Sequence, residues 1–553
     1  MGVEQEPTHS LRLSGMENAP DFIAIDTEQD HIPMTTLQRC VVIGAGIGGL
    51  SAAARLARAG IPVIVLEANA YAGGCASTFY HQGYRFDTGA TLAAGFYPGG
   101  PMDLLAQATG ISSWTGNPAQ DAMSVYLPNG QQIRLWNDDR RWQERQNAFG
   151  PLAIPFWQWQ ERTADALWDL ALRLPAWPPQ SPRDWIGLTR TTTSWLGHMK
   201  DINTIPGLLA DALQPVSVHL EKAPENLRLF VDAQLLISAQ VTSHHANALY
   251  GASALDLSRR GVIHLEGGMG SIAEKLVMAI RQHGGQVIFH QEVSHIVYDH
   301  NQPVAIETRH GDYFPLDILI ANLTPPNLTP LIGEDIREIR RKMPSIPQDG
   351  WGAFMIYVGF DGGVVPSKAS LHHQVIVGRP LGEGNSVFVS ISPEWDANRA
   401  PAGKRAATIS AHTDMRVWWQ LYTQDPSGYE DRKAAYTEKM LKSAEIALPG
   451  ITDSARLILQ GTPVTFQRFT RRSKGWVGGF PQTNLLRCWA PRLGPNFWLV
   501  GDSIFPGQSI AAVALGGLRV AQQVLNEVQY HPNILPSISS ASRSRSSHLE
   551  SIP

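Results

Sequence analysis

Three glycines and one glutamate near the start of the sequence have the types and spacing needed to bind a dinucleotide. The glycines form the pattern Gly44-x-Gly46-x-x-Gly49, and Glu67 follows at close to the spacing of about 20 residues that such sites use. In this pattern Gly44 permits a tight turn, Gly46 lets the backbone approach a pyrophosphate, and Gly49 lets a helix pack closely on a strand. The carboxylate of Glu67 can accept both hydroxyls of an adenosine ribose and disfavours the extra phosphate of NADP. The competing interpretation is a glycine-rich turn followed by a surface glutamate.

The elements that must position these residues form one βαβ unit. Residues 39–43 are a short apolar run, which predicts a buried strand of the parallel type. Residues 50–59 are rich in alanine and predict a helix, which Gly60 ends, and residues 61–66 predict a second buried strand. The glycines therefore lie where the first strand turns into the helix, and the helix N-terminus faces the phosphates.

A second carboxylate, near the C-terminus, favours FAD over NAD. Residues 498–502 predict a strand that ends in Gly501-Asp502, before a turn with Pro506 and Gly507 and an alanine-rich helix. A carboxylate in this position can hydrogen-bond a ribityl hydroxyl, and the helix N-terminus can face the flavin or its phosphates. NAD dehydrogenases have no use for this further element. The competing interpretation of Asp502 is a simple helix cap.

Composition and charge exclude several other classes of protein. The 553 residues include 43% hydrophobic and 17% charged residues, which is typical of a globular protein with room for two to four domains. The formal net charge of -4 gives no overall attraction to nucleic acid. The three scattered cysteines predict neither a disulfide framework nor a zinc site, and the histidines lack ligand spacing, so we expect no metal.

Neither the N-terminus nor any later segment predicts targeting or membrane spanning. Seven acidic residues and two arginines precede Cys40, which is unlike a secretory signal or a transit peptide. No apolar stretch of about 18 residues is uninterrupted, so we expect no transmembrane helix. No Ser-His-Asp set or carboxylate pair is visible, and we therefore name no catalytic residue.

The sequence resembles the superfamily of FAD-dependent amine oxidases and phytoene desaturases, and within it the carotenoid desaturases and carotenoid isomerases. The likeness is strongest to the bacterial carotenoid C-3',4'-desaturases. The segments that carry the resemblance are Val41 to Gly49, Glu67, Gly73 to Phe79, Gly83 to Gly95, Phe230 to Leu236, Gly267 to Gly270, Val293 and Gly501 to Gly517. The resemblance covers nearly the whole chain from Cys40 to Glu527.

The resemblance implies which residues contact FAD. They are Gly44, Gly46, Gly49, Glu67, Gly73, Gly74, Gly89, Ala90, Val293, Asp502, Gly507, Ser509 and Ile510. Val293 would contact the adenine through its backbone, Asp502 the ribityl-phosphate region, and residues 507–510 would approach the isoalloxazine. One position departs from the family: many relatives have arginine after the double glycine, where this chain has Cys75. We interpret Cys75 as a small thiol beside the cofactor, with a redox role as the alternative.

The predicted fold class is α/β, with a discontinuous Rossmann-like FAD-binding domain and an α+β substrate-binding domain. The FAD-binding domain is expected in residues 38–113, 261–330 and 459–530, and the substrate domain in residues 114–260 and 331–458. Residues 1–37 and 531–553 are expected to be a disordered extension and a disordered tail.

A tryptophan-rich segment, residues 156–195, allows two interpretations. Tryptophan is favoured at membrane–water interfaces, and prolines break the segment into short pieces. The segment could therefore insert into the interfacial region of a membrane. Alternatively, these side chains fill the interior of the substrate domain. The first interpretation agrees with a peripheral membrane protein on the cytoplasmic side, without a signal peptide.

The function that the resemblance implies is desaturation of a carotenoid at its C-3',4' bond, with FAD as the oxidant and a quinone or oxygen as the final electron acceptor. Two alternatives remain. One is a carotenoid cis-trans isomerase that uses reduced FAD. The other is a non-enzymatic isoprenoid carrier related to Rab GDP-dissociation inhibitors, against which the intact glycines, Glu67 and Asp502 argue.

Overall fold

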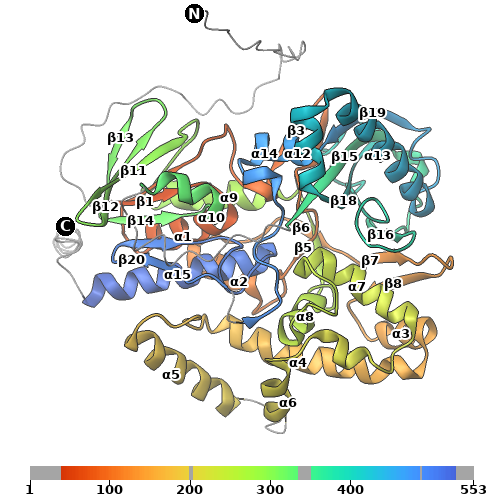
Figure 1. Cartoon of the computed structure of the whole chain (residues 1–553), viewed down its shortest axis with the longest axis horizontal. Helices are drawn as coiled ribbons and strands as arrows, with labels where there is room; N and C mark the ends of the chain where they lie inside the picture. The colour runs from red at the N-terminus through yellow and green to blue at the C-terminus, as the bar shows by residue number, and fades with distance from the viewer. Residues whose placement is uncertain (1–38, 199–203, 334–349, 486–487, 531–553) are drawn as a thin grey trace, which may run out of the picture. The chain divides into compact units, whose positions relative to one another are not determined.

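The computed structural model describes residues 39–198, 204–333, 350–485 and 488–530 (Figure 1). The expected disordered segments, 1–37 and 531–553, lie outside the described residues. Among the described helices, none is both long enough and apolar enough to cross a membrane.

A six-stranded sheet is built from three distant parts of the sequence. Its order is β10 (Gln286–Ile288), β2 (Val63–Leu66), β1 (Cys40–Ile43), β14 (Ile318–Ala321), β21 (Phe497–Leu499) and β20 (Arg492–Gly494). Neighbouring strands are parallel except for the edge pair of β20 and β21. The four residues of β1 are all buried, as expected for a strand that is covered on both faces.

Helices α1 (Ile47–Arg58), α9 (Gly270–Gln282) and α15 (Ile510–Tyr530) pack beside this sheet, with α2 (Pro101–Thr109) against α15 (Figure 1). Helix α1 contacts both α9 and α15. A Cβ atom on Gly517 of α15 would lie 2.5 Å from the carbonyl oxygen of Gly48, so the two helices cross at backbone distance. Small residues at this crossing bring the N-termini of α1 and α15 toward one region.

A seven-stranded sheet forms the second layer. Its order is β19 (Ala455–Gly461), β15 (Trp351–Asp361), β18 (Lys404–Asp414), β17 (Ser386–Ile391), β16 (His372–Ile376), β7 (Asp121–Tyr126) and β8 (Gln132–Trp136). All pairs are antiparallel except β16 with β7. Helices α12 (Met415–Gln424) and α13 (Pro426–Ala447) pack on it around the fully buried Trp418.

Smaller elements join these layers. They are the hairpin β3 (Thr78–His81) and β4 (Tyr84–Asp87), the sheet of β5 (Ala93–Ala94), β9 (Val262–Leu265) and β6 (Gly116–Pro118), the sheet of β11 (Val293–Asp299), β12 (Gln302–Thr308) and β13 (Tyr313–Pro315), and helices α10 (Pro325–Leu328) and α14 (Pro463–Thr470).

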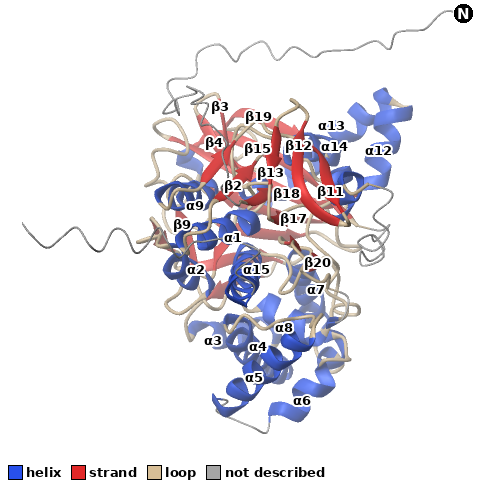
Figure 2. Cartoon of the chain, turned by 90° about the vertical axis from the view of Figure 1, so that its left-hand side faces the viewer, coloured by secondary structure: helices blue, strands red, loops and turns tan. Residues whose placement is uncertain are grey.

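A third, helical layer lies on one side of both sheets (Figures 1 and 2). It contains α3 (Arg140–Phe149), α4 (Ile154–Leu172), α5 (Pro182–His198), α6 (Thr204–Asp211), α7 (Glu225–Ala239) and α8 (Ala248–Leu255). In both views α5 and α6 lie at the end of this layer that points away from the sheets.

The tryptophan-rich segment is mostly interior. Trp157, Trp159, Trp168 and Trp195 are at most 8% exposed, whereas Trp185 on α5 is 59% exposed. The membrane-surface interpretation is therefore wrong for the four buried side chains, which pack in the interior of the protein. Only Trp185 remains a clearly exposed tryptophan of this segment.

The α/β fold class is confirmed, and one expected strand is corrected. Residues 286–297, which follow Gly284-Gly285, predict a single strand from the sequence alone, but in the structure β10 belongs to the six-stranded sheet and β11 to a separate sheet. The chain turns between them at His290, which has a positive φ of 58°. The domain boundaries stay a prediction, although the one at residue 458 falls inside β19.

Candidate cofactor site

A cavity of about 730 Å³ lies at the carboxyl ends of four parallel strands. Its walls include the residues that follow β1, β2, β14 and β21, which is where open α/β sheets bind ligands. Of the residues expected to contact FAD, those that line it are Gly44, Gly46, Glu67, Gly73, Gly74, Gly89, Ala90, Val293, Asp502, Ser509 and Ile510. Gly49 and Gly507 are not among the lining residues.

The glycine turn after β1 leaves no room for side chains. Gly46 caps α1 without any side-chain hydrogen bond to the first turn, and a Cβ atom there would collide with the amide of Asn322. A Cβ atom on Gly49 would lie 2.5 Å from the carbonyl oxygen of Gly44. Gly49 therefore allows the helix to pack on the strand, and Gly44 and Gly46 form the cavity wall.

Asn322 is a site residue that the sequence analysis missed. It follows β14, lines the cavity, and donates a hydrogen bond of 3.4 Å from Nδ2 to the carbonyl oxygen of Gly44. Its side chain lies close to Gly46 and Gly501, so it joins the two glycine turns that flank the cavity. Its position at the end of the apolar run from Asp317 to Asn322, which predicts a strand, was the signal that could have identified it.

Glu67 is buried at the end of β2, with 8% of its surface exposed. Its Oε2 accepts a hydrogen bond of 2.7 Å from the backbone N–H of Ala45, and its Oε1 accepts one of 2.9 Å from that of Asn69. Burial raises the pKa of the carboxyl, and these backbone hydrogen bonds oppose the rise. Each oxygen keeps a further lone pair, so the carboxylate can still accept ribose hydroxyls.

The double glycine and Gly89-Ala90 form a continuous part of the wall around Cys75. The N–H of Ala90 donates to the carbonyl oxygen of Cys75 over 2.9 Å, and a Cβ atom on Gly89 would lie 3.1 Å from the same oxygen. The Cys75 thiol lines the cavity, and burial raises its pKa, which favours the protonated form. This geometry agrees with a thiol that packs beside the cofactor.

Asp502 forms an ion pair with Arg472, which the sequence analysis also missed. The distance from Arg472 Nη1 to Asp502 Oδ2 is 2.9 Å, and both side chains are less than 20% exposed. Arg472 Nε donates to the carbonyl oxygen of Trp476 over 2.7 Å, and Nη2 donates to that of Gly478. Asp502 therefore meets the cavity already paired with a buried guanidinium.

The start of α15 forms the next part of the wall. Ser509 has φ of 97°, a conformation that L-residues rarely adopt, and its Oγ accepts a hydrogen bond of 3.2 Å from the N–H of Ala512. Ser509 and Ile510 line the cavity, so the N-terminus of this long helix lies at the cavity wall. Gly507 lies behind them, where a Cβ atom would collide with Gln482.

Beyond this region the cavity becomes apolar and continues between the seven-stranded sheet and the helical layer. Its walls there come from β7, α7, α8, β15 and β17, through Met123, Ile237, Leu255, Leu257, Met355 and Phe388. Burial lowers the pKa of His412, which also lines this part, to about 4, so the ring is neutral at pH 7. Within the described ranges, no group of three or more His, Cys, Asp or Glu side chains could hold a metal ion.

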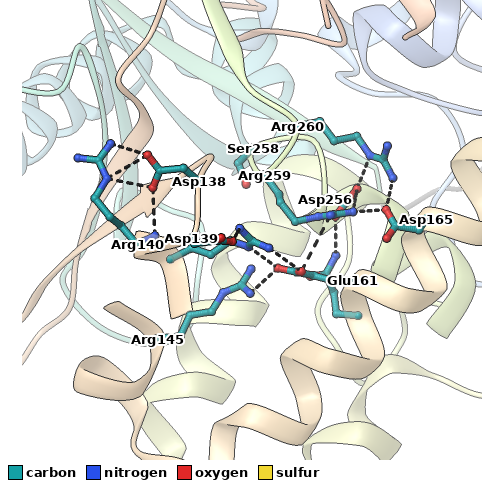
Figure 3. Close-up of polar contacts among 12 residues, drawn as sticks. Asp138, Asp139, Arg140, Arg145, Glu161, Asp165, Asp256, Ser258, Arg259 and Arg260 are labelled. Carbon is teal, nitrogen blue, oxygen red and sulfur yellow. Dashed lines mark hydrogen bonds and ion pairs between the residues drawn. The ribbon is translucent and has the colours of Figure 1, made fainter. Parts of the chain in front are cut away.

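A network of ion pairs supports the wall next to Leu257 and Ser258 (Figure 3). The fully buried Asp256 accepts hydrogen bonds of 2.5 Å from both Arg259 and Arg260. Further along the network, Arg259 pairs with Asp165 of α4, and Glu161 of α4 accepts from Arg141 and Arg145 of α3. The network thus fixes the segment after α8 to two helices of the helical layer.

The residues present fit FAD. The glycine turn and the N-termini of α1 and α15 suit phosphates, while the buried carboxylate of Glu67 suits a ribose. The apolar side chains of the adjoining wall, such as Met123, Ile237 and Phe388, suit an apolar substrate. The residue contacts themselves stay predictions.

Comparisons with known proteins agree with this fit. The family described as flavin containing amine oxidoreductase matches residues 47–525. The chloroplastic prolycopene isomerase of Arabidopsis thaliana is 26% identical, over 89% of this chain and 83% of that protein. The neurosporene-forming phytoene desaturase of Rhodobacter capsulatus is 23% identical, over 88% of this chain and 94% of that protein.

Solved structures share the fold. An oxidoreductase from Methanosarcina mazei aligns with a TM-score of 0.56 and 17% identity, over 88% of this chain and all of that one. Cyclohexylamine oxidase from Brevibacterium oxydans aligns with a TM-score of 0.54 and 15% identity, over 90% of this chain and all of that one. The chain therefore belongs to the flavin containing amine oxidoreductase family, and its cofactor is FAD.

Proposed function

We propose that this flavoprotein oxidises a long polyene and introduces the C-3',4' double bond of a carotenoid. The observation that carries the proposal is one continuous cavity, which joins the predicted cofactor region to an apolar region lined by Met123, Ile237 and Phe388. The relatives named prolycopene isomerase and phytoene desaturase support a carotenoid substrate.

In the proposed reaction the substrate loses two hydrogens, one as a hydride and one as a proton. When bound, FAD supplies the acceptor for the hydride or its equivalent, and a quinone or oxygen would later reoxidise it. The apolar wall would bind the polyene, align its end with the flavin and exclude water. No described residue is assigned a proton-transfer role. The ion-pair network behind Leu257 and Ser258 would keep this wall in place.

Product mass distinguishes the desaturase from the isomerase, which is the second candidate because prolycopene isomerases are among the relatives. A desaturated product is about 2 Da lighter and has a longer conjugated system, because both hydrogens leave the substrate. The test supplies lycopene-type and one-end-modified carotenoids to membrane-reconstituted enzyme, with quinone or oxygen present. Formation of a product of unchanged mass, only under reducing conditions, would support the isomerase and refute the desaturase.

The third candidate, a carrier that binds isoprenoids without chemistry, is tested by the cofactor content. We expect the purified protein to be yellow and to hold FAD in a ratio near one per chain. Bleaching by an added carotenoid under anaerobic conditions would then show that electrons reach the flavin. A colourless protein that binds carotenoids would support the carrier.

We also propose that the protein docks reversibly on a membrane surface, since its apolar substrate dissolves in the bilayer. Support comes from α5 and α6, at the far end of the helical layer (Figure 2). Trp185 and Ile186 on α5 are more than 50% exposed, and Leu209 and Leu213 on or next to α6 are 68% and 88% exposed. Leu209 lies in α6 and Leu213 two residues after its end, so the two exposed leucines are close together in the sequence.

Liposome co-sedimentation tests this surface. Replacing Leu209 and Leu213 by serine should weaken partitioning by about 100-fold or more, because each leucine that enters the membrane contributes about 1.5–3 kcal/mol. The control is Ile446→Ser on α13, where an isoleucine is 52% exposed on a different layer. Equal loss in both variants, or no loss in the double variant, would refute the docking surface.

A further inference from the structure

Arg472 brings a buried positive charge into the cavity wall. Its side chain is 14% exposed, and the wall residues include both Arg472 and its partner Asp502. A guanidinium has five N–H donors, and a single N–H, at Nη1, reaches Asp502. Two further donors go to the carbonyl oxygens of Trp476 and Gly478. The contact with Asp502 is therefore not the two-pronged pairing that a guanidinium and a carboxylate can form, and donor capacity remains.

Cys75 is a further neighbour of the Arg472 guanidinium. Arg472 interacts with the thiol of Cys75, which burial keeps protonated. A thiol is a poor acceptor for a guanidinium N–H. The N–H groups of Arg472 that neither Asp502 nor the two carbonyl oxygens accept can therefore still bind an anion in the cavity. Arg309 and Arg471, the other arginines of the wall, both pair with Glu292 instead.

Arg472 and the N-terminus of α1 meet in the same part of the cavity. Cys75 follows Gly74 directly, and a Cβ atom on Gly74 would lie 3.7 Å from the Cα of Gly46, the residue that caps α1. No side chain caps this helix, so its first N–H groups are available to a ligand. A guanidinium and an uncapped helix N-terminus are both features that bind phosphate oxygens.

We propose that Arg472 binds the diphosphate of FAD, together with the N-terminus of α1. In this arrangement the guanidinium bridges two anions: the carboxylate of Asp502 on one side and the diphosphate on the other. The sequence contains no arginine after the double glycine, and Arg472 reaches the same neighbourhood from a distant segment. Its role is direct contact with the cofactor.

A purely structural role is the rival explanation, and the chain contains a matched control for it. Arg492 also has one carboxylate partner, Glu527, to which it donates from Nη1 over 2.6 Å and from Nη2 over 3.0 Å. It also donates to two nearby carbonyl oxygens, those of Gly494 and Pro495. Arg492 does not line the cavity. Arg492→Gln therefore measures how the loss of such an ion pair changes the stability of the protein, without any change in the cavity wall.

The experiment titrates FAD-depleted protein with FAD, ADP and riboflavin by calorimetry. ADP carries the diphosphate without the flavin, and riboflavin carries the flavin without the diphosphate. Arg472→Gln should weaken FAD and ADP by the same factor, on the order of 10- to 100-fold, and leave riboflavin unchanged. Arg472→Lys should recover part of the ADP affinity, and Arg492→Gln should change none of the three. Unchanged ADP affinity, or an equal loss for riboflavin, would overturn the proposal.

A second variant keeps the proposal testable even where Arg472→Gln does not fold. Asp502→Asn removes the competing anion and keeps the arginine. If Arg472 contacts the diphosphate, ADP affinity in this variant should be unchanged or tighter. If Arg472 only orients Asp502, ADP binding should be insensitive to Arg472→Lys, and that result would refute a direct contact.

Discussion

Replacing Glu67 by alanine should weaken FAD binding on the order of 10- to 100-fold. The carboxylate lies at the end of β2 and is predicted to accept the hydroxyls of the adenosine ribose. Hydrogen bonds to a charged acceptor contribute about 1.5–3 kcal/mol, which corresponds to that loss in affinity. The same change also removes the acceptor of the Ala45 and Asn69 N–H groups, so the free protein should lose stability as well.

A change in the ligand separates these two effects. Fluorescence titration compares FAD with an analogue that lacks the 2'-hydroxyl of the adenosine ribose, on wild type and on Glu67→Ala. If the carboxylate accepts that hydroxyl, the analogue should bind worse than FAD to wild type and equally well to the variant, because the two deletions remove one interaction. Additive losses would refute the ribose assignment.

The raised pKa of Glu67 gives this prediction a pH dependence. The ribose hydroxyls need the ionised carboxylate as acceptor, and burial shifts its protonation to higher pH than for a free glutamate. FAD affinity should therefore decrease as the pH falls through the raised pKa, by up to about tenfold per pH unit. The stability of the protein without FAD should depend on pH in the opposite direction. A carboxyl with a raised pKa stabilises the folded state at low pH, and this contribution is lost as the pH rises.

Three further predictions concern the free energy of unfolding, measured with urea. Asp256→Asn should lower the free energy of unfolding by about 3–5 kcal/mol, because this fully buried carboxylate pairs with Arg259 and Arg260. The control, Asp138→Asn at an exposed ion pair, should change it by less than about 1 kcal/mol. Equal effects of the two substitutions would contradict the buried network. Gly49→Ala should cost about 1–3 kcal/mol through the clash with Gly44, while Gly187→Ala, in open space within α5, should be neutral or stabilising. Between pH 6.5 and 4 the protein should lose stability as the pH falls. Burial lowers the pKa of His264, His373 and His412 to about 4, so the unfolded chain binds more protons than the folded chain in this pH range. A free energy of unfolding that does not change with pH in this range would show that these histidines titrate normally.

The βαβ unit was predictable because its information is local. Expected strands at 39–43 and 61–66 correspond to β1 and β2, and the expected helix at 50–59 corresponds to α1, which begins earlier at Ile47. An apolar run, a glycine pattern and an alanine-rich stretch each specify their own element without help from distant residues. The FAD-binding character followed from the same residues, since they determine where a helix N-terminus must point.

Residues whose role depends on distant neighbours were not predictable in this way. Arg472 lies in the sequence Arg471-Arg472-Ser473-Lys474, which reads as an exposed basic run until the fold brings it to Asp502 and Cys75. The burial of Trp157 and Trp168 was ambiguous for a similar reason, because composition does not tell which face of α4 packs inward. Residues 286–297 were read as one strand, since no strong turn residue marks the change of direction at His290.

The strand order of the six-stranded sheet determines when this protein can become a flavoprotein during its synthesis. Strand β21 pairs with β14 and β20, and residues 500–513 after it form one side of the cavity. A growing chain therefore lacks that side until almost all of the described sequence has left the ribosome. Long-range pairing of this kind folds slowly and exposes apolar surface meanwhile. We therefore expect cofactor capture only after residues 500–513 have been synthesised, and nascent chains that stall before Phe497 should be substrates for chaperones.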